Sequence, residues 1–263
     1  MQPAASRALP PYPPGHGLLR GKTVLITAAA GTGIGFSTAK RCLEEGATVF
    51  ISDMHERRLG DAAAQLEPIG ALAGFHPCDV TRESDVRALV SAALGTLGRI
   101  DVLVNNAGLG GSAAIVDMTD DQWSKVLDVS LTSVFRMTRA VLPHMYERNS
   151  GAIVNNASVL GWRAQALQSH YAAAKAGVMA FTRCAAVEAA EHGVRINAVA
   201  PSLALHEFLS RVTSEELLTQ LQQREAFGRA AQTWEVANVI VFLASELSSY
   251  MTGEVVAVSS QRA

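Results

Sequence analysis

The sequence has 263 residues, a formal net charge of −2, 49% hydrophobic residues and 6% aromatic residues. This length suits one large domain, and the apolar, aromatic-poor composition favours helices packed closely on a sheet over an all-β protein. The small net charge, without runs of like charge, lacks the signature of nucleic-acid binding. Cys42, Cys78 and Cys184 lack CxxC spacing, which argues against a disulfide framework or a zinc site. We therefore expect small-molecule chemistry in a reducing cytoplasm.

Residues 1–16 form a proline-rich segment that contains Pro3, Pro10, Pro11, Pro13 and Pro14. It has no continuous apolar stretch, so we expect neither a signal peptide nor a membrane-spanning helix. We interpret it as a flexible arm that is mobile or lies along the surface. The remaining residues, 17–263, are predicted to form one domain.

Apolar runs of strand length alternate with helical patterns along this domain. Strands are predicted at 23–27, 48–52, 74–78, 100–105, 151–155, 195–199 and 254–258. Helices are predicted at 35–45, 56–66, 83–97, 120–148, 170–191 and 233–245. With right-handed crossovers, this alternation predicts an α/β fold: a single Rossmann-like, doubly wound parallel sheet with helices on both faces.

Residues 202–230 depart from the alternation, because they contain helical fragments but no clear strand. An insertion here would follow the carboxyl end of a strand, where ligands bind in such folds. We interpret this segment as a small substrate lid.

A glycine-rich turn, Gly31-Thr32-Gly33-Ile34-Gly35, lies between the first predicted strand and the first predicted helix. Glycines allow backbone N–H groups at a helix N-terminus to approach a pyrophosphate. An ordinary tight loop is the alternative. The context favours a dinucleotide site formed by these five residues.

Asp53 ends the second predicted strand, where a carboxylate would accept hydrogen bonds from the adenosine ribose hydroxyls. Its charge would repel a 2′-phosphate, so NAD is the expected cofactor, although Arg57 and Arg58 lie nearby in the sequence. The alternative role for Asp53 is a helix N-cap.

Small and polar residues also follow the next two strands, as Asp79-Val80 and as Asn106-Ala107-Gly108. Such residues often serve only to turn the chain. Because carboxyl ends of parallel strands share one edge, we add these five residues to the predicted cofactor site.

Tyr171 and Lys175 are four residues apart at the start of a predicted helix, so their side chains share one face. A nearby ammonium can lower the pKa of a tyrosine from about 10 toward neutrality, which would suit proton transfer. Ser158, after the strand at 151–155, could hold the substrate oxygen that Tyr171 protonates. An amphipathic surface pair and a turn serine are the alternatives.

Together these features resemble the short-chain dehydrogenase/reductase family from about Gly17 to the end of the chain. The matching segments are TAAAGTGIG at 27–35, Asp53, NNAG at 105–108, Ser158, YAAAK at 171–175, RINAVAPS at 195–202 and TGEVVAV at 252–258. The resemblance implies a homodimer or homotetramer that passes a hydride between a nicotinamide and a carbinol or carbonyl carbon. It also implies that Tyr171 and Lys175 contact the cofactor, Lys175 at the nicotinamide ribose.

The sequence departs from the family pattern at four positions. Ala28 replaces a usual glycine in a phosphate loop that is one residue longer, and Ser130 replaces an asparagine of the catalytic group. Ser202, which we include among the cofactor-binding residues, replaces the glycine of a Pro-Gly pair, and His206 replaces a threonine. These changes affect the nicotinamide half of the pocket most.

Within the family, GHGLL at 15–19, VNNASVLGWRAQ at 154–165 and PSLALHEFL at 201–209 resemble the actinobacterial branch that degrades the last two steroid rings. The resemblance implies a steroid-derived bicyclic hydroxyacyl-CoA thioester as substrate. Arg163 and Arg211 are candidate contacts for CoA phosphates, with surface solubility as the alternative.

Two other functions stay open. One is an NADPH-dependent 3-oxoacyl thioester reductase of fatty-acid type, against which Asp53 argues. The other is a non-catalytic dinucleotide-binding protein, against which Ser158, Tyr171 and Lys175 argue. No histidine pair has metal-ligand spacing, and we expect no metal, nucleic-acid or membrane partner.

Overall fold

The computed structural model describes residues 8–206, 209 and 214–260. Seven of the strands in these residues form one parallel sheet in the order β3-β2-β1-β4-β5-β6-β9. The strands are β1 (Thr23–Ile26), β2 (Thr48–Asp53), β3 (Leu72–Pro77), β4 (Val102–Asn105), β5 (Gly151–Asn156), β6 (Val194–Pro201) and β9 (Val255–Val258). Strand order reverses between β1 and β4, so the predicted doubly wound α/β fold is confirmed.

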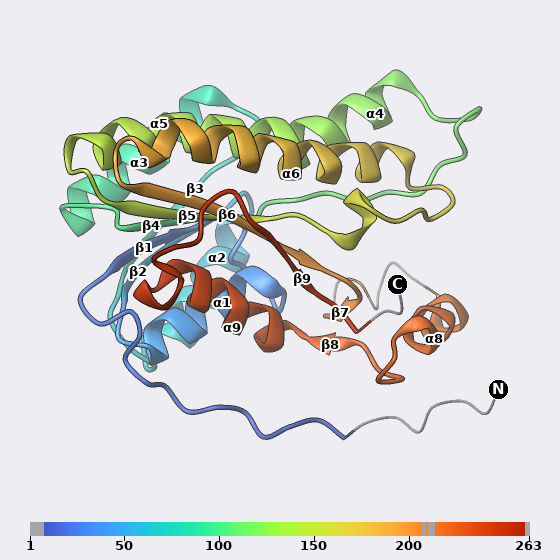
Figure 1. The fold of residues 1–263 in the computed structure, drawn as a ribbon, viewed down its shortest axis with the longest axis horizontal. Coiled ribbons are helices and arrows are strands. Elements are labelled where there is room, and N and C mark those ends of the chain that lie inside the picture. The colour runs from blue at the N-terminus through green and yellow to red at the C-terminus, as the bar shows by residue number, and fades with distance from the viewer. Residues whose placement is uncertain (1–7, 207–208, 210–213, 261–263) are drawn as a thin grey trace.

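Helices cover both faces of this sheet (Figure 1). One face carries α1 (Ile34–Glu44), α2 (Glu56–Leu66) and α9 (Thr233–Ala244). The other carries α3 (Glu83–Leu97), α4 (Asp120–Leu127), α5 (Ser133–Glu147) and α6 (Ser169–Ala190). In β1, Val24 and Ile26 belong to the core on the first face, and Leu25 belongs to the core on the second. Burial on both faces explains the continuous apolar runs of the strands.

Two parts of the predicted element pattern need correction. The helix predicted over 120–148 is divided by a π-helical turn, Asp128–Thr132, which separates α4 from α5. A short strand, β7 (Ala204–Leu205), lies in the segment that was expected to lack one, and it pairs with β8 (Ala231–Gln232). A two-residue strand carries no periodicity, so its signal is absent from the sequence. Most other predicted helix and strand boundaries differ from the observed ones by one or two residues.

The rest of the predicted lid contains α8 (Glu215–Arg224). Figure 1 shows α8 beside β7 and β8, at the end of the sheet where β9 terminates. Residues 207–208 and 210–213 of this segment, including Arg211, lie outside the described residues. The lid role stays a prediction.

The described part of the proline-rich arm lies along α1 and α9. The hydroxyl of Tyr12 donates a hydrogen bond of 2.7 Å to Glu44, and Lys40 donates one of 2.9 Å to that hydroxyl. The ring of Tyr12 contacts Trp234 edge-on, with 5.3 Å between ring centroids. Residues 1–7 lie outside the described part of the chain. None of the described helices has the length and hydrophobicity needed to cross a bilayer.

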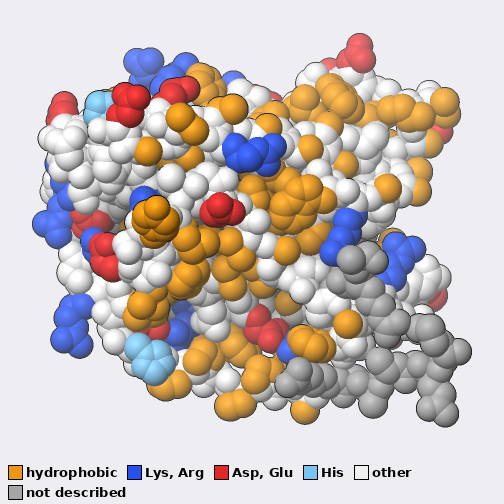
Figure 2. All heavy atoms as spheres, in the orientation of Figure 1, with side chains coloured by type: hydrophobic (Ala, Val, Ile, Leu, Met, Phe, Trp, Pro, Cys, Tyr) orange, Lys and Arg blue, Asp and Glu red, His pale blue; other side chains and the backbone are white. Residues whose placement is uncertain are grey.

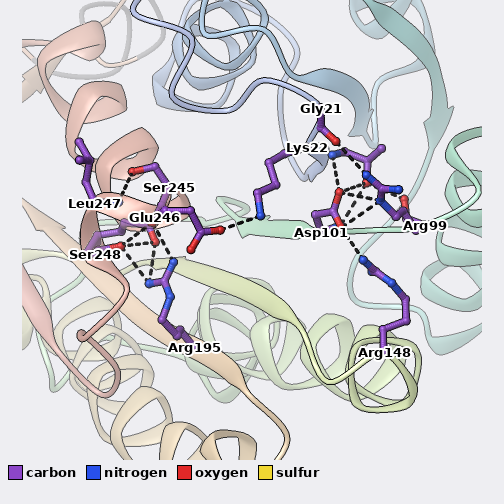
Figure 3. Close-up of polar contacts among 12 residues, drawn as sticks. Gly21, Lys22, Arg99, Asp101, Arg148, Arg195, Ser245, Glu246, Leu247 and Ser248 are labelled. Atoms are coloured by element: carbon purple, nitrogen blue, oxygen red, sulfur yellow. Dashed lines mark hydrogen bonds and ion pairs between the residues drawn. The ribbon is translucent and has the colours of Figure 1, made fainter.

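A buried carboxylate fastens the amino ends of β1 and β4 (Figure 3). Asp101 accepts hydrogen bonds from the backbone N–H of Thr23 at 2.9 Å, from Arg148 at 2.6 Å and from Arg99 at 3.0 Å. Burial alone would raise the pKa of Asp101, but these hydrogen bonds hold it below the ordinary value. Nearby in Figure 3, Arg195 donates to the Ser245 carbonyl at 3.0 Å and to Ser248 Oγ at 2.9 Å.

We predict that Asp101→Asn lowers the free energy of unfolding by about 2 kcal/mol at pH 7, because two charged donors lose a charged acceptor. The folded-state pKa of Asp101 lies below the unfolded value of 3.8. Its contribution is therefore present above that pH and is lost as pH falls through the folded pKa. Urea unfolding between pH 3 and 7 should show the gap to wild type narrowing below about pH 4. The exposed Asp61→Asn control should change stability by less than about 0.5 kcal/mol.

Candidate active site

Loops at the carboxyl ends of β1, β4 and β5 are joined by asparagine side chains. Asn106, after β4, donates from Nδ2 to the carbonyls of Thr27 at 3.2 Å and Ala28 at 2.9 Å, beyond β1. Asn156, at the end of β5, donates to Asn106 Oδ1 at 2.9 Å. These bonds span the point where strand order reverses, which is where ligands bind in open α/β sheets.

The glycine-rich loop leaves the N-terminus of α1 uncapped. Gly33 is the N-cap and offers no side-chain acceptor, and the first turn of α1 contains no acidic residue. A Cβ atom built on Gly31 or Gly33 meets open space. The backbone N–H groups of this turn, which begins at Ile34, therefore lack a side-chain cap, as a pyrophosphate site requires. Thr32 lies in the same loop.

Two other positions in this loop explain its shape. Ala28, where the family pattern has glycine, has φ +51°, so the backbone keeps a conformation that favours glycine. Gly35 packs so closely that a Cβ there would lie 2.3 Å from the Ala28 carbonyl oxygen and 2.5 Å from Asn106 Nδ2. Gly35 is therefore required by space, and any larger residue would displace Asn106.

Asp53 lies beside this loop and is 8% exposed. Its Oδ2 atom accepts a hydrogen bond from Ala30 N–H at 3.2 Å, and its Oδ1 atom accepts one from His55 N–H at 3.0 Å. Burial raises the pKa of Asp53 above its ordinary value. The hydrogen bond from Ala30 and the positive charge of Arg58 lower it, but by less. His55 is the N-cap of α2, so the N-cap alternative for Asp53 is wrong. Arg57 and Arg58 are exposed.

The remaining predicted cofactor residues lie at the ends of β3, β4 and β6. Asp79 Oδ1 accepts from Thr81 N–H and Thr81 Oγ1, which forms a turn, and Val80 is buried. The N–H of Ala107 donates to Thr27 Oγ1 at 3.2 Å. The backbone N–H of Ser202 donates to Val258 at the edge of the sheet.

Three of the four predicted catalytic residues, Ser158, Tyr171 and Lys175, come together at the start of α6, whereas the fourth, Ser130, binds the backbone of Leu109. Lys175 is 2% exposed, and its Nζ donates to the Asn156 carbonyl at 2.6 Å and lies 5.6 Å from the Tyr171 ring centroid. Ser158 Oγ accepts from Leu160 N–H at 3.2 Å, and Ser158 lies close enough to the phenol of Tyr171 to lower the pKa of that phenol. Gly108 approaches the same group, since a Cβ there would lie 3.3 Å from Lys175 Nζ.

Burial determines the protonation of this pair. It raises the pKa of Tyr171 above its ordinary value, although the hydrogen bond with Ser158 opposes this. It lowers the pKa of Lys175 to about 8. The expectation that the Lys175 ammonium lowers the pKa of Tyr171 is therefore not met in the polypeptide alone. A tyrosine with a raised pKa keeps its proton at neutral pH, as protonation of a carbonyl oxygen requires.

Ser130, His206 and Arg163 occupy different surroundings. Ser130 is fully buried in the π-helical turn, where its Oγ donates to the Leu109 carbonyl at 3.0 Å and accepts from Leu109 N–H at 2.9 Å. It therefore anchors the loop that follows β4. His206 accepts from Leu209 N–H at 3.4 Å, and burial lowers its pKa. Arg163 is half-buried eight residues before Tyr171.

Two residues of the site were missed in the sequence. Asn156 links Asn106 to Lys175, and its only signal was a second asparagine at the end of a predicted strand. His170 is buried directly before Tyr171 and was left without a role. Within the described ranges there is no group of three or more His, Cys, Asp or Glu side chains that could hold a metal ion.

Known proteins resemble this chain over nearly its whole length. A family model described as Enoyl-(Acyl carrier protein) reductase matches residues 28–260. The chain is 64% identical over 249 residues to the (5R,7aS)-5-hydroxy-7a-methyl-1-oxo-2,3,5,6,7,7a-hexahydro-1H-indene-carboxyl-CoA reductase of Mycobacterium tuberculosis, covering 94% of this chain and 95% of that protein. It is 38% identical over 240 residues to a 3-oxoacyl-(acyl-carrier-protein) reductase, FabG, of Thermotoga maritima. This match covers 91% of this chain and 97% of that protein.

Solved structures agree with these relatives. A crystal structure of a short chain dehydrogenase from Mycobacterium smegmatis is 58% identical in sequence, with a TM-score of 0.86, and the match covers 97% of this chain and 99% of that one. The glycine-rich turn, the strand order and the Tyr171–Lys175 pair are thus found in a chain whose relatives are dehydrogenases and reductases. This chain belongs to the short-chain dehydrogenase/reductase family and is an oxidoreductase that acts on CH–OH groups.

Proposed function

We propose that this enzyme uses NAD to interconvert a secondary alcohol and a ketone on a steroid-derived bicyclic hydroxyacyl-CoA thioester, in the catabolism of steroid rings. The observation that carries the reaction is the arrangement of Ser158, Tyr171 and Lys175 beside the asparagine-linked loops. The substrate is inferred from the 64% identical mycobacterial reductase, whose name specifies a bicyclic indene-carboxyl-CoA.

In this proposal Tyr171 transfers the proton and Ser158 holds the substrate oxygen, while Tyr171 and Lys175 also contact the nicotinamide ribose. NAD supplies or accepts the hydride when bound. The turn from Gly31 to Gly35 holds the pyrophosphate. The other proposed cofactor contacts are Asp53, Asp79, Val80, Asn106, Ala107, Gly108 and Ser202. Ser130 contributes by fixing Leu109 above the site.

The preference for NAD is inferred from the position of Asp53. Its carboxylate lies against Ala30 in the loop where the pyrophosphate would bind, so a 2′-phosphate would meet a negative charge. Arg57 and Arg58 are exposed at the start of α2. They are the residues that would favour NADP if the proposal is wrong.

An apolar rim supports a bulky hydrophobic substrate. Ile115, Val116, Trp162 and Leu167 are exposed in the loops that precede α4 and α6. Figure 2 shows hydrophobic side chains gathered over the α4 end of the molecule. Exposed apolar groups of this kind often border ligand grooves.

One alternative has a specific observation in its favour. The Thermotoga maritima relative is named as a 3-oxoacyl reductase, so a linear 3-oxoacyl thioester reduced with NADPH is the second candidate. A non-catalytic dinucleotide-binding protein is not favoured, because the catalytic side chains are present and in contact.

Two further parts of the proposal concern the setting of the enzyme. A homo-oligomer, dimer or tetramer, is supported by the exposed Phe135 and Val187 on the neighbouring helices α5 and α6. A reducing cytoplasm is supported by three free cysteines in the described chain.

We predict that Tyr171→Phe lowers kcat by at least about 100-fold, because it removes the proton donor while preserving volume. The affinity for NADH, measured by tryptophan fluorescence, should stay within about threefold of wild type. Tyr250→Phe, which alters a fully exposed tyrosine, is the control and should leave kcat unchanged. Near-normal turnover by Tyr171→Phe would contradict the assignment.

We predict that Asp53→Asn shifts the ratio of NADH to NADPH affinity toward NADPH by about tenfold, because it removes a charge near the expected 2′-phosphate position. Fluorescence titration with both cofactors measures this ratio. The exposed Asp61→Asn should leave it unchanged. An unchanged ratio in Asp53→Asn would mean that another group selects the cofactor.

The substrate is tested by following absorbance at 340 nm with the preferred cofactor and a panel of bicyclic and linear hydroxyacyl-CoA and ketoacyl-CoA esters. The proposal predicts NADH preference and turnover of a bicyclic thioester. NADPH preference with turnover of linear ketoacyl esters would contradict the proposal and support the 3-oxoacyl thioester reductase alternative. Binding of NADH without turnover of any ester would support the non-catalytic alternative.

A further inference from the structure

His170 is a buried titratable residue that the proposed chemistry does not use. It lies in the first turn of α6, directly before Tyr171, and is 2% exposed. Its Nδ1 atom is buried and has no hydrogen-bond partner among the described residues. Buried polar atoms are nearly always paired, so this histidine is held in place by packing and not by a hydrogen bond from Nδ1.

The loop after β4 packs directly against this histidine. A Cβ built on Gly111 would lie 3.1 Å from His170 Nε2, and one built on Gly110 would lie 4.0 Å from Tyr171 Cδ2. The distance to His170 is shorter than an ordinary van der Waals contact, whereas the distance to Tyr171 is an ordinary one. Gly111 has no left-handed φ, so a side chain there would be opposed by close packing and not by backbone conformation.

The same loop is fastened at both ends. Ser130 binds both backbone groups of Leu109 at one end. At the other end, Ala113 N–H donates to the Leu167 carbonyl at 3.1 Å, and Gln168 donates to Ser112 Oγ at 3.2 Å. Two segments beside Tyr171, 109–113 and 167–170, are thus held together.

The backbone at this junction is strained. Leu167 has φ +67°, a conformation that a γ-branched side chain rarely adopts, and its side chain is exposed. Local strain persists where surrounding contacts impose it, and such positions concentrate at functional sites. The hydrogen bonds to the 109–113 segment flank this residue on its carbonyl and on the side chain that follows it.

We propose that His170 is a positioning residue whose ring holds the 109–113 segment at a fixed distance from Tyr171, so that the Gly111–His170 contact sets the space available to a substrate beside Tyr171. This inference rests on the proposed function only in placing the substrate beside Tyr171. A rigid bicyclic ring system cannot adapt to a narrower or displaced wall, whereas a slender linear acyl chain can. The contact therefore determines selectivity for wide substrates.

The test is a double-mutant cycle with Gly111→Ala and His170→Ala. Gly111→Ala pushes the loop off the histidine ring, and it should lower kcat/KM for the bicyclic thioester about tenfold, mainly through KM. His170→Ala should also lower kcat/KM for the bicyclic thioester. In the double variant the added methyl enters the space that the ring has left, so kcat/KM should recover at least about threefold over Gly111→Ala.

Controls separate positioning from folding. Gly95→Ala, on α3 with open space around its Cβ position, should have the same kcat/KM as wild type. The melting temperature and the NADH affinity of Gly111→Ala should also match wild type. If His170→Ala lowers the melting temperature, His170→Asn, which loses the Nε2 contact but stays polar, replaces it in the cycle.

Additive losses in the double variant, or a Gly111→Ala variant that behaves like Gly95→Ala, would overturn the inference. Failure of the proposed function gives a different result, because wild type would then turn over linear ketoacyl esters or no ester. With turnover of linear esters, which the displaced wall should not affect, the cycle is measured as calorimetric affinity for the bicyclic thioester. Without turnover, calorimetric affinity for the bicyclic thioester replaces kcat/KM, and equal affinities in wild type and Gly111→Ala would refute the proposed contact.

Discussion

The side chain of Asn106 is the contact on which both halves of the site depend. It holds the Thr27 and Ala28 carbonyls of the phosphate loop, and it is held in turn by Asn156, whose own carbonyl binds Lys175. One chain of hydrogen bonds therefore fixes the glycine-rich loop relative to Lys175 across three strands. Hydrogen bonds in such a part-buried network strengthen one another.

The sequence predicted the sheet well, because strands buried on both faces leave continuous apolar runs that are short and bounded by turns. It did not predict the π-helical turn at Asp128–Thr132, since one extra residue in a helix hardly alters the apolar pattern. It did not predict β7 either, because a pair of two-residue strands is determined by tertiary contact with β8.

The candidate site was predictable where it depends on spacing and less so where it depends on backbone contacts. The four-residue interval between Tyr171 and Lys175 places both on one helix face, and the glycines of the phosphate loop have their own pattern. The partner of Lys175, however, is the backbone carbonyl of Asn156, and Ser130 binds the backbone of Leu109. Every residue type carries these backbone groups, so the sequence does not indicate which of them bind a side chain. The packing of His170 against Gly111 likewise appears only when two distant segments meet.

The Tyr12 contacts have a practical consequence for handling the enzyme. Tyr12 joins Lys40 and Glu44 of α1 to Trp234 of α9, so the proline-rich arm covers part of the helix that follows the glycine-rich loop. An affinity tag or fusion partner placed close to Tyr12 would compete with these contacts. Tags are better separated from the arm by a cleavable spacer, and truncated versions that begin at residue 17 would lack this link between the two helices.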